Sequence, residues 1–561
     1  MNTKLILSLL CGSAIVLTGC SKKLNQFSAD YFSTNPSPLE VVGENVPATV
    51  TANIPSKFFV KNAEVTVTPY LVYAGKETAS APYTVQGEKV RGNNQVIPFE
   101  SGSTVTIPVM YKYEPEMMHS DLYLGFDVKQ GKKAYVLPRV KVADGVIATA
   151  TLSDAGTVKP AIASDKYQRI INEKYNADIK FLINQTNIRA GELSSEAIKG
   201  LHNELKAANA ADNKEVEGIS ISSYASPEGG VKVNTRVAEG REKSTQAYLN
   251  KQLKSDKISK FGELTADFTA QDWEGFKSLV SASNIQDKDL ILSVLEMYKD
   301  PEQREKEIRN LSSVFDQLAK EILPQLRYSR LTASINVIGK SDEAIMAAFE
   351  SNPKELNVDE MLYCATLTKD NNKKLKIYET AVNQFPDDHR AYNNLGMCQY
   401  INKDIESASR NFAKAGSMAP ASSEAKMNLG LVSLANNDYR TAHEKFGSAV
   451  GVNELPEALG VLYMKTGDYS AAAKSFGDSK TNNAALSQIL VKDYSAAKKT
   501  LSSIENPDAT THYLNAILGA RTNNEQVVTS NLRKAASLDG NMVKKAKSDL
   551  EFAKFDISKI F

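Results

Sequence analysis

The chain has 561 residues, of which 42% are apolar and 24% charged, and its 67 basic side chains nearly balance 66 acidic ones. That length exceeds one hydrophobic core, so we expect about three or four domains, and the ordinary composition argues against a largely disordered chain. With a net charge near zero, the chain has no excess of basic side chains of the kind that binds nucleic acid, so we exclude nucleic acid as a partner.

The N-terminal segment has the pattern of a lipoprotein signal peptide. Lys4 precedes an apolar run from Leu5 to Leu17 that is too short for a membrane-spanning helix. The run ends in Leu-Thr-Gly-Cys, which resembles the bacterial lipobox. The resemblance implies cleavage before Cys20 and acylation of that cysteine, so residues 1–19 are predicted to be the signal peptide and Cys20 the lipidated membrane anchor.

Residues 20–40 are polar and contain two prolines near their end, which predicts a flexible tether. Its first residues are Ser21, Lys22 and Lys23. Lipoproteins on the outer surface of Bacteroidetes resemble one another in carrying acidic residues at these positions. The lysines therefore favour the periplasmic face of the outer membrane. No later stretch of the sequence is long and apolar enough to span a bilayer.

Residues 41–155 are predicted to form a β-sandwich. Short runs of β-branched and aromatic residues alternate with polar ones and are separated by Gly, Asn, Pro and Ser, which is typical of antiparallel strands. The runs are ATVTANI, AEVTVTPYLVY, STVTIPVMYKY, DLYLGFDV and KAYVLPRVKV. We expect two sheets packed in an immunoglobulin-like way, with a role as a spacer or a contact surface.

Residues 156–340 are predicted to form an α/β domain. A strand-like KFLIN at 180–184 precedes an amphipathic segment, Ser194–Ala207, a second strand at 215–226 and a helix, Asn234–Leu253. This order predicts helices on one face of a sheet. A helical insertion opens at Gln271-Asp272-Trp273, where Trp273 is predicted to be a core residue, and the chain returns to strand at 329–339.

Within this domain, residues 222–249 resemble the C-terminal domain of the OmpA family, in which an aspartate and an arginine bind the diaminopimelate of peptidoglycan. Asn234 and Arg241 occupy the family's asparagine and arginine positions, whereas Ser226 replaces the aspartate and Glu228 follows two residues later as a substitute. The resemblance implies peptidoglycan as a ligand. A hydroxyl in place of a carboxylate weakens the ammonium contact by about 1–2 kcal/mol. An exposed, structural Arg241 paired with a neighbouring glutamate is the alternative.

Residues 341–561 are predicted to form a tetratricopeptide-repeat solenoid, all α-helical. Leu395, Gly396, Ala408, Phe412 and Ala415 recur 34 residues later as Leu429, Gly430, Ala442, Phe446 and Ala449. About five or six repeats follow from this pattern. The first helix of each repeat lines a concave groove that holds peptides or partner proteins in the family. The predicted groove residues are Arg390, Asn393, Met397, Tyr400, Glu424, Met427, Leu431 and Leu434, although packing between repeats is an alternative role.

No catalytic or cofactor motif is evident. The five histidines lie outside metal-ligand spacing, and phosphate-binding loops, nucleophile elbows and zinc-protease motifs are not found in the sequence. We therefore expect no enzyme activity, no metal and no cofactor. The predicted function is an outer-membrane lipoprotein scaffold in an envelope assembly or secretion machine, recruiting envelope proteins through its repeats and contacting peptidoglycan. The alternative is a surface-exposed adhesin or glycan-binding lipoprotein.

Overall fold

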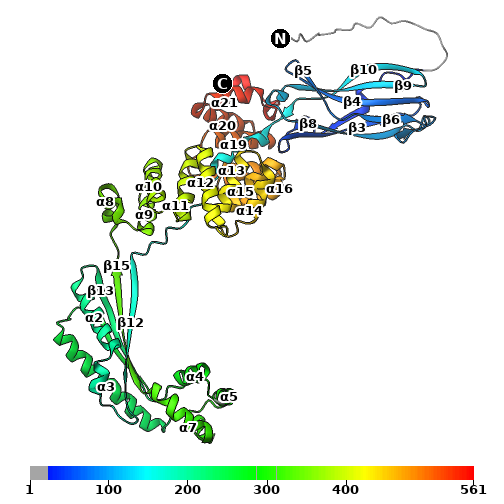
Figure 1. Ribbon diagram of the computed structural model, residues 1–561. Coiled ribbons are helices and arrows are strands. Elements are labelled where there is room, and N and C mark those ends of the chain that lie inside the picture. Colours follow the sequence, from blue (N-terminus) through cyan, green and yellow to red (C-terminus); the bar gives the residue numbers. More distant parts are fainter. Residues whose placement is uncertain (1–22, 286, 311) are drawn as a thin grey trace. The chain divides into compact units, whose positions relative to one another are not determined.

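The structure, a computed structural model, describes residues 23–285, 287–310 and 312–561. The predicted signal peptide and Cys20 lie outside these residues. The chain forms two compact units (Figure 1): the first combines the residues up to Ser164 with those from Val382 onward, and the second comprises Asp165–Ala381. The second unit is therefore an insertion in the sequence of the first.

The N-terminal part of the first unit is a β-sandwich, as predicted. A three-stranded sheet has the order β1-β3-β8, and a second sheet has the order β10-β9-β4-β6-β7 with β5 paired to β4. One apolar core lies between them. The elements are η1 (Ala29–Tyr31), β1 (Phe32–Asn35), β2 (Leu39–Glu40), β3 (Asn45–Ile54), β4 (Ala63–Tyr73), β5 (Lys76–Ala79), β6 (Tyr83–Gly87), β7 (Gln95–Ile97), β8 (Ser103–Lys112), η2 (Pro115–Met118), β9 (Ser120–Gln130), β10 (Lys133–Asp144) and β11 (Val146–Ile147).

The predicted flexible tether is wrong for residues 24–40. Leu24 and Phe27 are buried in the sandwich core, and the Phe27 ring stacks on Phe126 at 4.4 Å between centroids. β1 pairs with β3, and β2 with β11. The sequence around Leu24 and Phe27 is polar and contains prolines, so these two residues do not stand out as core residues. Their partners, Tyr135 and Phe126, lie about a hundred residues further along the chain.

After β11 the chain leaves the sandwich as an extended segment with two short turns, η3 (Thr149–Leu152) and η4 (Ala155–Thr157). The predicted boundary at residue 156 is displaced, because residues up to Ala163 pack on the C-terminal helices of the same unit. The sheet of the second unit begins only at Ile170.

The second unit contains a four-stranded sheet of order β12-β15-β13-β14. Helices α2 and α3 contribute apolar side chains to the core on one face of this sheet, in agreement with the predicted α/β arrangement. The elements are β12 (Ile170–Lys180), α1 (Ala190–Leu193), α2 (Glu196–Ala210), β13 (Lys214–Tyr224), α3 (Val231–Ser255), β14 (Glu263–Thr269), α4 (Trp273–Ala282), α5 (Lys288–Met297), α6 (Pro301–Asn310), α7 (Ser312–Glu321), η5 (Leu323–Leu326), β15 (Tyr328–Ile338), α8 (Asp342–Ser351), η6 (Pro353–Glu355), α9 (Val358–Thr366) and α10 (Asn371–Gln384).

The strand predicted at 180–184 is misplaced. β12 ends at Lys180, and the chain then turns away with Phe181 buried and Leu182 and Ile183 exposed. β14 was not predicted from the sequence. Trp273 is buried in a separate small core of the helical insertion, as expected.

The C-terminal part of the first unit is a solenoid of antiparallel helix pairs, with five pairs between His389 and Leu538. In four of them an aspartate caps the second helix by accepting a hydrogen bond from the backbone N–H three residues on. The elements are α11 (His389–Ile401), α12 (Ile405–Met418), α13 (Ser423–Ala435), α14 (Tyr439–Gly447), α15 (Leu455–Thr466), α16 (Tyr469–Phe476), α17 (Asn482–Leu490), α18 (Tyr494–Ser502), α19 (Ala509–Arg521), α20 (Glu525–Leu538), α21 (Asn541–Ser548), η7 (Leu550–Phe552) and η8 (Ile557–Lys559).

Close approach within a helix pair explains the repeated glycine. A Cβ on Gly430 would lie 2.5 Å from a ring carbon of Phe446. We expect Gly430→Ala to lower the free energy of unfolding by about 1–3 kcal/mol, because the phenylalanine must move from its packed position. Thermal or denaturant unfolding of the purified chain measures this. Gly447→Ala is the matched control, because a Cβ there meets nothing within 4 Å, and an equal loss in both variants would contradict the packing argument.

Candidate functional site

The groove of the solenoid is occupied by the chain's own extended segment. Asn394, Asn428 and Asn483 project from the first helices of three repeats, α11, α13 and α17, and each pairs with the backbone of one residue of that segment. All three asparagines are buried. The solenoid therefore holds an extended polypeptide mainly through its backbone.

Each contact uses both ends of a side-chain amide. Asn428 Oδ1 accepts the N–H of Ala161 at 2.7 Å, and its Nδ2 donates to the Ala161 carbonyl at 2.8 Å. Asn394 makes the same pair with Ala163 at 2.8 and 3.0 Å. Asn483 makes it with Asp154 at 3.0 and 2.9 Å. Because this pairing satisfies a backbone donor and acceptor together, it compensates for burying the segment.

Side chains of the segment also contribute to docking. Val158, Ala161 and Ala163 are buried, whereas Ile162 is 42% exposed. At the start of the segment, Thr149 donates to Glu551, which is itself paired with Arg521 of α19. Small, mostly uncharged residues therefore face the groove.

The predicted groove residues divide into three groups. Asn393 donates to the Ala161 carbonyl at 3.0 Å. Burial, and secondarily the nearby Asp154 carboxylate, raises the pKa of Tyr400. Arg390 instead pairs with Asp388 in its own turn, at 2.7 Å, and Glu424 accepts from Ser422. The apolar members are buried: Met397, Met427, Leu431 and Leu434.

Sequence reasoning missed the three asparagines that bind the segment most completely. Asn394 and Asn428 are separated by one repeat of 34 residues and stand directly before the two Leu-Gly pairs. Asn483 occupies the same place relative to the capping aspartate of its partner helix, ten residues before Asp493. The asparagine that recurs directly before these two Leu-Gly pairs could have indicated a binding position in the groove.

In the second unit, Arg241 is 1% exposed and bound within the protein. Its guanidinium donates to the carbonyls of Gln185, Tyr224 and Leu182 at 3.0, 2.6 and 3.1 Å. Burial, and secondarily the nearby Arg327, lowers the pKa of Arg241 to about 10. The arginine therefore ties the end of β13 to the loop that follows β12.

The other residues of the predicted peptidoglycan site also have partners inside the unit. Glu228 forms a two-point ion pair with Arg327, at 3.0 and 2.8 Å, and the same guanidinium contacts the Ser226 hydroxyl at 3.4 Å. Asn234 donates to the carbonyls of Ser226 and Gly229. The structure thus brings all four predicted residues to one turn and places a second arginine among them.

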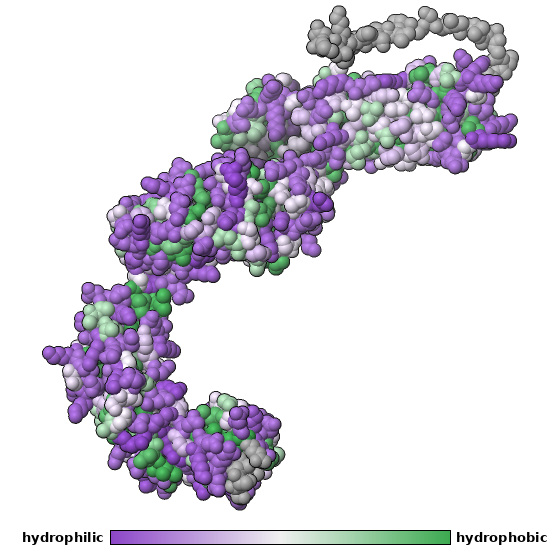
Figure 2. Space-filling model, viewed as in Figure 1, coloured by the Kyte–Doolittle hydropathy of each residue, from purple (hydrophilic) through white to green (hydrophobic). Residues whose placement is uncertain are grey.

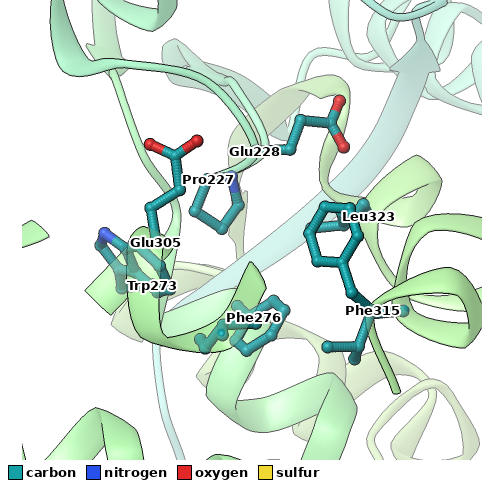
Figure 3. Close-up of a pocket in the computed structure, with 9 residues that line it drawn as sticks. Pro227, Glu228, Trp273, Phe276, Glu305, Phe315 and Leu323 are labelled. Atoms are coloured by element: carbon teal, nitrogen blue, oxygen red, sulfur yellow. The ribbon is translucent and has the colours of Figure 1, made fainter. Parts of the chain in front are cut away.

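A small cavity lies beside this turn, between it and the helical insertion. Figure 3 shows the rings of Trp273, Phe276 and Phe315 around it, with the carboxylates of Glu228 and Glu305 on one side. Its volume of about 10 Å³ corresponds to roughly one water molecule. The cavity is too small for an organic ligand in this conformation.

Comparison with known proteins gives structural neighbours only for parts of the chain. A tetratricopeptide repeat protein from Parabacteroides merdae matches with 15% identity and a TM-score of 0.30, covering 37% of this chain and 91% of that one. PilF of Pseudomonas aeruginosa matches with 13% identity and a TM-score of 0.30, covering 39% of this chain and all of the other. Yeast Tom70 matches with 12% identity and a TM-score of 0.26, covering 64% and 77%.

No family model and no curated protein matches the sequence. TM-scores below 0.5 do not establish a shared fold, so the repeat assignment rests on the 34-residue spacing and the helix pairs. Among the described residues, no helix is long and apolar enough to cross a membrane, and no group of three or more His, Cys, Asp or Glu side chains is arranged to hold a metal ion.

Proposed function

We propose that this protein is a lipid-anchored scaffold of the bacterial envelope, attached through Cys20 to the periplasmic face of the outer membrane and recruiting envelope proteins through its helical repeats, as part of an assembly or secretion machine. The observation that carries the scaffold function is the solenoid itself, with asparagines in three repeats that bind an extended backbone. Repeat solenoids present large surfaces of this kind to other proteins.

The bound segment determines where partners can bind. Its backbone occupies the polar positions of the groove, at Asn393, Asn394, Asn428 and Asn483. A partner therefore either displaces this segment or uses the outer surface of the helices. Site-specific photo-crosslinking in cells separates the two routes: probes at exposed positions of the second helices, such as Arg410 and His443, report on the outer surface, and a probe at Ile162 reports on the groove. If neither set captured a protein of the envelope, the scaffold function would be rejected.

The membrane anchor has a direct test. We expect Cys20→Ser to move the protein from the membrane fraction to the soluble fraction, because each buried methylene of the acyl chains contributes about 0.8 kcal/mol. Cell fractionation with immunodetection measures the shift, and mass spectrometry of the mature N-terminus identifies the modification. Cys364→Ser is the matched control. Recovery of an unmodified thiol at position 20 would rule out the anchor.

Contact with peptidoglycan has weaker support than the scaffold function, because Arg241, Asn234 and Ser226 are engaged within the unit. The turn is tested through Glu228, which is paired with Arg327 and whose side chain is 13% exposed. If the turn binds the wall, Glu228→Gln lowers the fraction of protein that sediments with purified peptidoglycan, whereas Glu196→Gln on the exposed surface of α2 does not. Equal sedimentation of both variants and the parent chain would leave the turn without a role in wall binding.

A further inference from the structure

The first described residues, Lys23 and Leu24, lie on one end of the sandwich. The N–H of Leu24 donates to the Tyr135 hydroxyl at 3.1 Å, and the Leu24 side chain is 3% exposed. The ammonium group of Lys23 lies over the Tyr135 ring at 5.7 Å. This contact fixes the point at which the chain from Cys20 reaches the folded protein.

Very little chain separates that point from the lipidation site. Between Cys20 and Leu24 there are only three residues, Ser21, Lys22 and Lys23. Since consecutive Cα atoms are 3.8 Å apart, the two positions can be separated by no more than about 15 Å, whatever the local conformation. If Cys20 carries acyl chains, as the proposed function requires, this end of the sandwich is held next to the lipid headgroups.

Four loops and turns meet at the same end. The loop between β3 and β4 binds two of its neighbours, through hydrogen bonds from the Lys57 N–H to the Phe99 carbonyl at 2.5 Å and from the Lys89 N–H to the Lys61 carbonyl at 2.8 Å. The side chain of Gln130, at the β9–β10 turn, donates to Asn62 of the same loop at 3.1 Å. We call this surface the basic end; it consists of residues 23, 55–62, 88–94, 98–102 and 129–133.

The basic end carries a strong excess of positive charge. Its basic residues are Lys23, Lys57, Lys61, Lys89, Arg91, Lys129, Lys132 and Lys133, and its acidic residues are Glu88 and Glu100. The formal charge of these segments is therefore +6, whereas the whole chain has a net charge of +1. Including Glu64 and Asp127, which lie further along β4 and β9, still leaves +4. Lys61 is partly buried and pairs with Glu88 at 2.9 Å, and the other seven basic side chains are exposed.

The solenoid contacts the opposite end of the strands. The Tyr439 hydroxyl donates to Glu44, just before β3, at 2.5 Å, and the Tyr469 hydroxyl accepts from the Gly43 N–H at 3.1 Å. β3 then runs ten residues to the basic end, a length of about 33 Å. The solenoid is thus attached far from the basic end, where Figure 2 shows mainly hydrophilic residues on the face in view.

We propose that the basic end is a membrane-contact surface that binds the anionic phospholipid headgroups of the bilayer into which Cys20 is anchored. Charge complementarity and the short connection to Cys20 both select a lipid surface as the partner. A basic side chain near an anionic bilayer strengthens binding about fivefold, so a cluster of eight gives a firm preference for one orientation. The sandwich then stands upright on the membrane and holds the repeats away from it.

The test uses the full mature chain carrying Cys20→Ser, so that acylation does not contribute to binding. We expect it to co-sediment with vesicles of phosphatidylglycerol and phosphatidylethanolamine and much less with vesicles of phosphatidylcholine. Replacing Lys89, Lys132 and Lys133 by glutamine should lower the partition coefficient for the anionic vesicles about a hundredfold. The control replaces three exposed lysines outside the basic end, Lys112, Lys474 and Lys498, by glutamine and changes the net charge equally.

Several results would overturn the proposal: equal binding to both kinds of vesicle, no binding to either, or an equal loss of binding in the control variant. Failure of the scaffold's lipid anchor is a separate result, because it is seen in the mass of the mature N-terminus and in cell fractionation. The vesicle experiment is carried out on chains that cannot be acylated at position 20.

Discussion

Arg241→Ala is expected to lower the free energy of unfolding of the second unit by about 3–5 kcal/mol. The substitution removes the hydrogen bonds from Arg241 to the carbonyls of Tyr224 and Gln185. It also removes one of the two donors to the Leu182 carbonyl, which keeps the N–H of Gln185, and each buried acceptor without a partner costs about 1–3 kcal/mol. The Phe181 ring also loses the guanidinium that lies 5.1 Å from its centroid. Denaturant unfolding followed by circular dichroism measures the loss.

Arg236→Ala provides the matched control, because Arg236 lies on the same helix α3 and is exposed. Its expected effect is within about 0.5 kcal/mol. If Arg241→Ala unfolded no more easily than Arg236→Ala but lost peptidoglycan sedimentation, the arginine would be a ligand-binding residue. Arg241 would then have no structural role.

The combined substitution Asn394→Ala and Asn428→Ala is expected to release the bound segment from the groove. Ala161 and Ala163 lose both hydrogen bonds of Asn428 and Asn394, and the donation from Asn393 to Ala161 remains. A local loss of about 3 kcal/mol should raise the amide exchange rates of Ala161 and Ala163 on the order of a hundredfold. Hydrogen exchange with mass spectrometry over residues 153–164 measures this.

Asn436→Ala combined with Asn541→Ala controls for the loss of two asparagines, since both side chains are exposed on the same solenoid. Protection of residues 153–164 should be unchanged in this control. If the groove variant also retained full protection, the asparagines would not be what holds the segment.

The regular elements of the fold were predictable because their patterns are local. The period-two runs of the sandwich became β3, β4, β8, β9 and β10 with bounds shifted by a few residues. The 34-residue spacing predicted α11 to α14. The spacing is visible in the sequence because Gly430 packs so closely on Phe446 that any larger residue would clash with the ring. In both cases the period of the residue pattern matches the period of the strand or the helical repeat, so the pattern predicts the element.

The parts that sequence reasoning missed depend on contacts between distant segments. The KFLIN run has the apolar composition of a strand, but its carbonyl at Leu182 binds Arg241 instead of a neighbouring strand. Residues 153–163 contain Gly, Pro and Ala without periodicity, and nothing in them indicates a groove formed more than 200 residues later. Leu24 and Phe27 look like isolated apolar residues in a polar tether until their partner Phe126 is known.

The long-range docking of residues 149–163 has a consequence for how the molecule is made. Their partners lie 231 to 402 residues further along the chain, so this stretch has nothing to bind until the C-terminal helices have been synthesised. Native contacts of such high sequence separation form slowly, and partly folded chains expose apolar surface. Residues 149–163 therefore stay undocked until the last helices have folded, and we expect chaperones to bind this stretch during that interval.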